Sequence, residues 1–157
     1  MQPDLSRLCN AIGYQFNDRG LLEQALTHRS AAKVNNERLE FLGDSILNAV
    51  ISACLYEQKP DNDEGELSRL RARLGRGETL AELAADLNLG DYIRLGEGEM
   101  KSGGNNRDSI LADALEAILG AIYLDGGYEA CAAVILHVFE TQIIKLPDAE
   151  DLKDPKT

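Results

Sequence analysis

The sequence predicts an all-α fold of a single domain, and three observations support it. Ala and Leu are abundant, aromatic residues make up only 5% of the chain and Trp is absent, a composition that favours helices over strands. Apolar residues recur at the three- and four-residue spacing of a helix face. Glycine or proline ends most of these segments. With 157 residues, 44% of them apolar, the chain is long enough to build one compact core.

Seven helices are expected, each bounded by capping or helix-breaking residues. Gly13 ends the first helix in the position of a left-handed cap, and Asn17 caps the second. Asn35 or Asn36 caps the long third helix, which Pro60 stops. The seven helices cover residues 4–12, 17–26, 36–58, 64–74, 78–90, 107–124 and 128–146.

Between the fifth and sixth helices, residues 91–106 contain four glycines and are expected to form a loop with a short extended piece. Asn106 is the expected cap of the sixth helix, and Gly126 marks its end. Residues 147–157 are charged and nearly devoid of apolar side chains, which indicates a linker. The expected organisation is therefore one domain over residues 1–146 with a polar tail.

The charge balance restricts the possible functions. Sixteen basic and 27 acidic residues give a formal net charge of −11, which as a whole would repel a nucleic acid. A nucleic-acid partner is compatible with this chain only if some acids bind metal and the basic residues cluster. Three widely spaced cysteines, no signal peptide and no apolar run of membrane-spanning length predict a soluble, cytoplasmic protein with reduced thiols and no membrane contact.

Acidic residues on the long third helix form the first part of a candidate site. Glu37, Glu40 and Asp44 are three and four residues apart, so they fall within an arc of roughly 60°. The opposite stripe is apolar, and because apolar residues also continue around the helix, its second half is expected to be buried on most sides. The stripe comprises Leu39, Leu42, Ile46, Val50 and Ala53.

A second acidic pair, Asp113 and Glu116, lies on another strongly apolar helix. No Lys or Arg occurs in residues 39–58 or 108–136, so neither acidic set has a local countercharge. Partly buried like charges without partners are costly and favour a bound cation. Oxygen donors from two helices suit a hard divalent ion such as Mg²⁺. The alternative is that the acids are solvated or interact with a helix dipole, which suffices for Glu37 alone. It explains Asp44, Asp113 and Glu116 poorly, because they lie inside apolar helix interiors.

Basic residues cluster despite the acidic net charge. The candidate nucleic-acid contacts lie before the third helix, along the fourth helix and beside the glycine-rich loop: Arg29, Lys33, Arg69, Arg73, Lys101 and Arg107. Surface pairing with Glu64, Glu66 or Glu78 is the alternative explanation for the arginines of the fourth helix. His28 near Ser30 resembles a nucleophile–base pair, but ordinary hydrogen bonds of a connecting segment are the favoured explanation.

Four stretches of the sequence match a known pattern in order and spacing. They are Leu26-Thr27-His28-Arg29-Ser30, Asn36-Glu37-Arg38-Leu39-Glu40-Phe41-Leu42-Gly43-Asp44-Ser45, Asp63-Glu64-Gly65-Glu66-Leu67-Ser68-Arg69, and Lys101-Ser102-Gly103-Gly104 followed by Ser109-Ile110-Leu111-Ala112-Asp113-Ala114-Leu115-Glu116-Ala117. Together they resemble the signature of the ribonuclease III family, most closely its bacterial members. The resemblance extends over essentially the whole chain.

The resemblance implies a helical endonuclease domain that dimerises, cuts double-stranded RNA and places an acidic site at each end of an RNA-binding valley. The family's metal-binding carboxylates match Glu40, Asp44, Asp113 and Glu116. Its catalytic acids match Asp44 and Glu116, with Glu37 and Glu64 at further acidic positions near the cut. Similar bacterial enzymes continue into a double-stranded-RNA-binding domain, so the tail of this chain resembles a linker to a domain that the chain lacks.

The expected chemistry is hydrolysis of an RNA phosphodiester bond by metal-activated water. One Mg²⁺, with Mn²⁺ as a substitute, would lower the pKa of the attacking water, and a second would stabilise the leaving oxygen. The resemblance adds 5′-phosphate and 3′-hydroxyl ends, a short 3′ overhang and a role in rRNA or mRNA processing. Phe41 lies on the carboxylate side and is expected to pack across a homodimer interface. A non-catalytic RNA-binding module and an acidic protein-interaction module are the alternatives.

Overall fold

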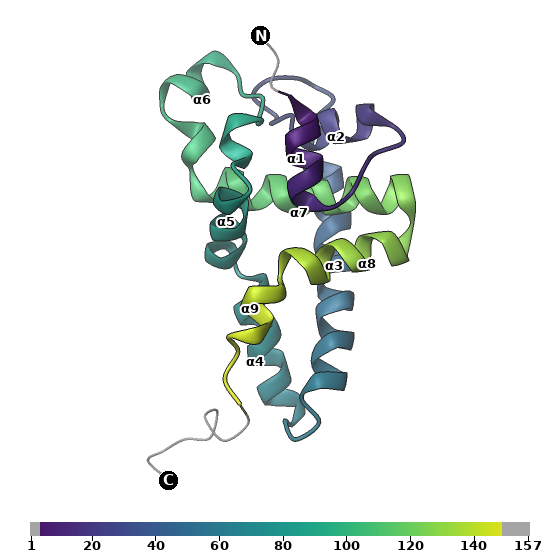
Figure 1. The fold of residues 1–157 in the computed structure, drawn as a ribbon. Helices are drawn as coiled ribbons and strands as arrows, with labels where there is room; N and C mark the ends of the chain where they lie inside the picture. Colours follow the sequence, from purple (N-terminus) through teal and green to yellow (C-terminus); the bar gives the residue numbers. More distant parts are fainter. Residues whose placement is uncertain (1–3, 149–157) are drawn as a thin grey trace.

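The computed structural model describes residues 4–148. In this range the chain forms nine α-helices, two 3₁₀ helices and no β-strand, so the all-α prediction is confirmed (Figure 1). The elements are α1 (Leu5–Ile12), α2 (Arg19–Ala25), α3 (Glu37–Gln58), α4 (Glu64–Gly75), α5 (Gly77–Asp86), η1 (Leu89–Asp91), α6 (Glu97–Lys101), η2 (Gly104–Asn106), α7 (Asp108–Gly126), α8 (Tyr128–Val138) and α9 (Glu140–Ile144). The predicted linker lies almost entirely outside the described residues.

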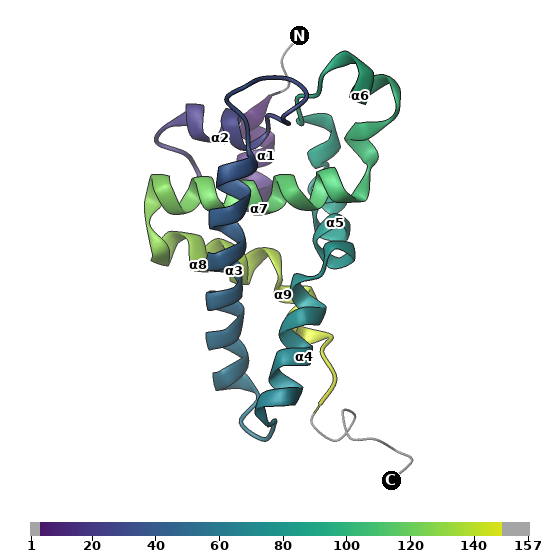
Figure 2. The same ribbon diagram turned by 180° about the vertical axis from the view of Figure 1, so that it is seen from behind.

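The central element of the fold is α7, in which twelve of nineteen residues are buried. It crosses the N-terminal half of α3 and also packs against α2, α5 and α8 (Figure 2). The C-terminal half of α3 extends away from this crossing with α4 at its side. The core between these helices consists mainly of Leu, Ile and Ala, as the composition predicts.

The crossing of α3 and α7 depends on two glycines that bring the helix backbones into contact. A Cβ atom at Gly43 would lie 1.8 Å from the carbonyl oxygen of Glu116, and one at Gly120 would lie 2.2 Å from the carbonyl oxygen of Leu39. No larger residue fits at either position without separating the helices. Because Glu40 and Glu116 lie one turn from these glycines, the backbone contact fixes the distance between them.

The first helix begins one residue later than predicted, and the cap of the second lies one residue after the predicted one. Asp4 caps α1, and Gly13 ends it with a φ of 85°. The cap of α2 is Asp18, whose Oδ1 accepts the N–H of Gly20 at 2.9 Å. The backbone N–H of Asn17 instead donates to Asp125 Oδ2 at 2.9 Å, a contact with α7 that local sequence does not reveal.

Asn35 and Asn36 make different hydrogen bonds at the start of α3. Asn35 Oδ1 accepts the N–H of Glu37 at 3.1 Å. Asn36 occupies the N-cap position without a side-chain cap bond, because its amide is buried and donates instead to the carbonyl of Ala25 at 3.1 Å. The loop before α3 is thereby fastened to the end of α2.

The glycine-rich segment 91–106 is more ordered than predicted. The fifth helix ends at Asp86 rather than near residue 90, and η1 forms at the predicted end of that helix. The short helices α6 and η2 follow where a loop was expected. The expected extended piece is a single parallel bridge between Thr27 and Arg94. Arg107, not Asn106, occupies the N-cap of α7, and α7 continues to Gly126. Short helices of three to five residues give too weak a periodic pattern to be recognised from sequence.

The last predicted helix is two helices, α8 and α9, that meet at Phe139. Phe139 is completely buried, and the chain bends there although no Gly or Pro is present. Tertiary packing of this aromatic ring overrides the local helix preference.

The C-terminal half of α3 is less buried than predicted. Ala53 is exposed, and Tyr56 is 76% exposed, because α7 and α4 cover only part of the circumference. By length and composition alone, α3 would also be apolar enough to cross a membrane, with a mean hydropathy of 1.3, which the sequence expectation did not anticipate. Its buried stripe packs against α7, as in the core helix of a globular protein.

Candidate metal centre and adjoining polar pocket

The crossing of α3 and α7 brings three acidic side chains together. Glu40 comes from the first turn of α3, and Asp113 and Glu116 lie on successive turns of α7. One carboxylate oxygen from each can be chosen so that all three lie within 4.8 Å of one another. We refer to these three residues as the carboxylate cluster.

Burial raises the pKa of all three carboxyl groups. Glu116 is only 8% exposed, and its pKa rises to about 9, first through desolvation and then through a hydrogen bond to Asp44. Desolvation followed by the charge of Asp113 raises the pKa of Glu40 to about 7. Desolvation also raises the pKa of Asp113, an effect partly offset by Glu40 and by His28. The cluster without a cation is therefore partly protonated at neutral pH.

In the part of the chain that the structure describes, no Lys or Arg pairs with this concentration of acid. In residues 4–148 no ion pair includes a carboxylate of the cluster; the pairs found are Arg29–Glu37, Lys59–Asp148 and Arg107–Glu99. A donor set made only of carboxylate oxygens, close together and half or fully buried, fits a hard divalent ion such as Mg²⁺.

Asp44 differs from the environment predicted for it. The sequence placed it inside an apolar helix interior, but its side chain is exposed on the rim of the cluster. Asp44 lies close enough to Glu116 to be one of the groups that raise its pKa, and Asn48 Nδ2 donates to Asp44 Oδ2 at 3.5 Å. Asp44 thus adjoins the three clustered carboxylates and is more accessible than they are.

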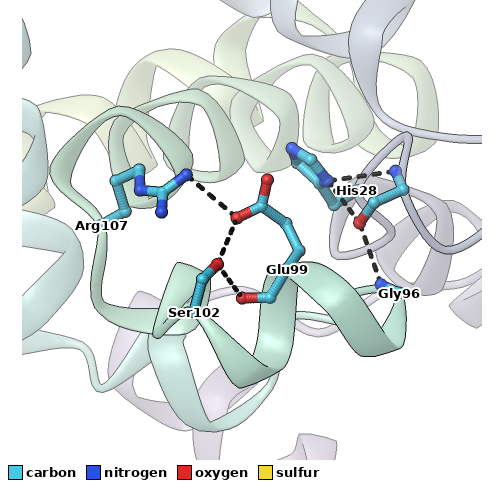
Figure 3. A network of polar contacts seen from close by, with 6 residues as sticks. His28, Gly96, Glu99, Ser102 and Arg107 are labelled. Atoms are coloured by element: carbon cyan, nitrogen blue, oxygen red, sulfur yellow. Dashed lines mark hydrogen bonds and ion pairs between the residues drawn. The ribbon is translucent and has the colours of Figure 1, made fainter.

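A polar pocket of about 350 Å³ adjoins the carboxylate cluster and carries both signs of charge. Arg107 on its wall donates to Glu99 Oε2 at 3.0 Å, and Ser102 Oγ donates to the Glu99 carbonyl at 3.0 Å (Figure 3). Its lining consists of His28, Arg29, Asn36, Glu37, Glu40, Glu99, Arg107, Ser109, Ile110 and Asp113. Glu99 was not identified from the sequence because it lies eight residues before Arg107, outside the spacing of helical pairs.

The structure divides the predicted basic residues between two surfaces. Arg29 and Arg107 line the polar pocket, and Lys33 and Lys101 are exposed on the segments that border it. Arg69 and Arg73 lie instead on α4, around a hollow of about 510 Å³. The alternative pairing of these arginines with Glu64, Glu66 or Glu78 is not found among residues 4–148.

Glu37 and Glu64, the two further acidic positions expected near the cut, lie at very different distances from the carboxylate cluster. Glu37 is on the rim of the polar pocket, with its Oε2 3.9 Å from Arg29 Nη1. Glu64 begins α4, which follows the C-terminal end of α3. At a rise of 1.5 Å per residue from Glu40 to Gln58, that end of α3 lies roughly 27 Å from the cluster. Within one chain, Glu64 does not contribute to the site.

Phe41 projects from α3 into solvent. Its side chain is 78% exposed, which is unusual for a large apolar residue. Beside it lies an apolar hollow of about 630 Å³, lined by Leu21, Gln24, Glu37, Arg38, Leu39, Phe41, Leu42 and Leu124.

Comparison with known proteins identifies relatives of this chain in sequence and in fold. The profile of the family described as Ribonuclease-III-like matches residues 18–143. The chain is 56% identical to ribonuclease 3 of Shewanella amazonensis over all of its own length and 70% of that protein. The crystal structure of the nuclease domain of ribonuclease III from Campylobacter jejuni is similar with a TM-score of 0.88 and 41% identity, covering 93% of this chain and 100% of that one.

A second structure of the Campylobacter jejuni nuclease domain matches with a TM-score of 0.86 and 44% identity, over 88% of this chain and 97% of that one. It is described for structural flexibility in a region involved in dimer formation. Sequence and structure therefore agree from α2 to α9, including both helices that carry the carboxylate cluster. The chain belongs to the ribonuclease III family.

Proposed function

We propose that this chain is a Mg²⁺-dependent endoribonuclease that cuts double-stranded RNA, with Mn²⁺ as a substitute ion. Cuts on both strands would leave 5′-phosphate and 3′-hydroxyl ends with a short 3′ overhang, in the processing of rRNA or mRNA in the cytoplasm. The observation that carries this proposal is the carboxylate cluster, a set of acids with raised pKa values and no compensating cation from the described chain. Family membership supports the activity on double-stranded RNA.

The proposed ion site consists of Glu40, Asp113 and Glu116, with Asp44 at its open edge. A divalent ion bound there supplies Lewis acidity that lowers the pKa of a nearby water and offsets charge on the phosphate. The carboxyl groups must lose their protons to bind it, so binding is favoured as pH rises. Burial of Glu116 excludes water from one side of the site, and the exposed Asp44 leaves the other side open to substrate.

Substrate binding is proposed for the basic residues around the polar pocket. Arg29, Arg107, Lys33 and Lys101 can contact phosphates beside the cluster. Recognition of a double strand by its A-form shape and 2′-hydroxyl groups requires no base-specific contacts. Arg69 and Arg73 on α4 provide a second positive surface for a longer duplex.

We propose a homodimer as the working form. The exposed ring of Phe41 and the apolar hollow beside it offer self-complementary surfaces, and the Campylobacter jejuni domain is described as having a region involved in dimer formation. A dimer also provides a role for Glu64, which can act near a cut only at the site of a partner subunit. Glu37, by contrast, can act at the site of its own chain.

The proposed activity is tested by cleavage of an end-labelled RNA duplex at low salt, with Mg²⁺ or with EDTA. Glu116→Gln should abolish Mg²⁺-dependent cutting. Glu57→Gln, an exposed acid at the other end of α3, is the matched control and should retain it. Duplex binding without any cutting by the wild-type dimer would favour the non-catalytic RNA-binding module. Neither binding nor Mg²⁺ dependence would favour the acidic interaction module.

A further inference from the structure

His28 is held in one orientation at the wall of the polar pocket. Its backbone N–H donates to the carbonyl of Arg94 at 3.0 Å, which ties this segment to the chain before α6. The backbone N–H of Ser30 donates to the imidazole Nδ1 at 3.1 Å, and Ser30 Oγ lies 2.8 Å from the same nitrogen. Ser30 Oγ also accepts the N–H of Gly96 at 2.9 Å (Figure 3). The ring is therefore fixed entirely through its Nδ1 side.

These contacts assign the proton of the neutral ring. A neutral imidazole has one donor nitrogen and one acceptor nitrogen. Because the backbone N–H of Ser30 can only donate, Nδ1 is the acceptor and Nε2 carries the hydrogen. Within residues 4–148, no acceptor is hydrogen-bonded to Nε2. The structure thus presents a single oriented N–H donor.

This N–H donor lies next to the proposed metal-binding carboxylates and the arginines of the polar pocket. His28 lines the polar pocket together with Glu40 and Asp113. In Figure 3 the second ring nitrogen is turned away from Ser30, toward Glu99 and Arg107. The Arg107 guanidinium is itself oriented by Glu99 at 3.0 Å. A neutral donor and a positioned guanidinium thus share one wall, an arrangement suited to the oxygens of a phosphate.

We infer that His28 contacts the RNA directly, its Nε2–H donating a hydrogen bond to a non-bridging oxygen of a phosphate seated in the polar pocket, with Ser30 as a positioning residue. The inference rests on the proposed nuclease function and adds a substrate contact to it. It requires no charge on the ring, since the neutral form already presents the donor. A phosphate oxygen is the fitting acceptor because it can only accept.

Two substitutions of His28 separate this role from a structural one. In His28→Asn the side-chain amide lies where Nδ1 was, so it keeps a partner for Ser30 but loses the donor at the Nε2 position. In His28→Gln the amide reaches the Nε2 position and retains a donor. The expected result is a KM for duplex RNA raised roughly 3- to 10-fold in His28→Asn, with kcat and the Mg²⁺ midpoint unchanged. His28→Gln should recover most of the lost affinity.

A phosphate-by-phosphate scan identifies the contact itself. Short RNA duplexes, each with one methylphosphonate in place of a phosphate, are titrated in EDTA by fluorescence anisotropy. At one position near the cut, the substitution should weaken binding to the wild-type chain and to His28→Gln. It should have no further effect on His28→Asn, because the contact is already missing. Substitutions at all other positions should weaken binding to all three proteins equally.

The outcomes distinguish this inference from the function on which it rests. If the wild-type chain cuts the duplex but the phosphate scan is the same for all three proteins, the proposed nuclease function stands and the His28 contact is overturned. A fall in kcat or in Mg²⁺ affinity in both His28 variants would also overturn it, because it would show that the ring supports Asp113 rather than RNA. A wild-type chain that neither binds nor cuts duplex RNA overturns both proposals.

Discussion

Gly43→Ala tests whether the backbone contact between α3 and α7 builds the site. The added Cβ would lie 1.8 Å from the Glu116 carbonyl oxygen, 2.8 Å from its carbonyl carbon and 2.9 Å from Gly120 N. All three atoms belong to the backbone of α7, so no side-chain rotation relieves the overlap. To reach an ordinary contact distance, the two helices must separate by more than about 1 Å.

The cost of this separation is the balance of two opposing effects. Overpacking a core costs about 1–3 kcal/mol, and a contact between backbones belongs at the upper end. Replacing Gly by Ala inside a helix stabilises the helix by about 1 kcal/mol. The net loss is therefore about 2 kcal/mol, which lowers Tm by roughly 4–8 °C in a chain of this size. Metal binding suffers more, because ligand distances tolerate changes of only about 0.2 Å.

The assay compares thermal unfolding and Mg²⁺ binding of Gly43→Ala with those of Gly77→Ala. Gly77 starts α5 and has no atom within 4 Å of an added Cβ, so its substitution should leave Mg²⁺ binding unchanged and Tm equal or slightly higher. We expect Gly43→Ala to lower Tm and to weaken Mg²⁺ binding at least 10-fold. A Gly43→Ala protein with wild-type Tm and Mg²⁺ affinity would refute the reasoning that the crossing sets the geometry of the site.

Three further predictions follow from contacts described above. In EDTA the free energy of unfolding should fall from pH 5 to pH 8, because protons leave carboxyl groups whose pKa values are higher in the folded than in the unfolded chain. Thermal melts of Glu116→Gln should show much less of this pH dependence. Asp125→Asn should cost about 2 kcal/mol in urea unfolding, since the carboxylate accepts from Tyr14 Oη at 2.6 Å and from two backbone N–H groups. Phe41→Ala should weaken the dimer by about 2 kcal/mol, or roughly 30-fold in Kd, by sedimentation equilibrium.

Each of these predictions has an outcome that contradicts it. Stability in EDTA that rises between pH 5 and pH 8 would show that the cluster is not held protonated by burial. An unchanged urea midpoint for Asp125→Asn would mean that this carboxylate does not fasten the segment before α2. A Phe41→Ala protein that remains an equally tight dimer would place the aromatic ring outside the interface.

The helices that carry the site could be predicted from the sequence because their apolar spacing and stop signals are local. The four residues Glu40, Asp44, Asp113 and Glu116 could be singled out because residues 39–58 and 108–136 contain no Lys or Arg and because they match the metal-binding carboxylates of the family that the sequence resembles. The structure brings Glu40, Asp113 and Glu116 together and leaves Asp44 at the edge. What sequence could not give is this difference in burial, which depends on how far α7 covers α3.

Several errors of the sequence interpretation share a physical cause, a tertiary contact that the local pattern does not indicate. The segment that begins α2 is positioned by Asp125, more than a hundred residues away, which accepts the backbone N–H groups of Asn17 and Asp18. The bend at Phe139 follows from burial of a ring against elements remote in sequence. The pairing of Glu99 with Arg107 arises only because α6 and η2 fold back on themselves. Local patterns contain no signal for any of these contacts.

The glycine contact between α3 and α7 has a consequence for the size of ion that the site can hold. Mg²⁺ binds oxygen at about 2.0–2.1 Å, whereas Ca²⁺ needs about 2.3–2.6 Å and more ligands. Glu40 and Glu116 are each one turn from a place where the helix backbones already touch, so the helices cannot close further, and the packed core of α7 opposes their separation. The distance between the carboxylate ligands is therefore set by contacts between main-chain atoms. Selection between divalent ions then depends on their ionic radius.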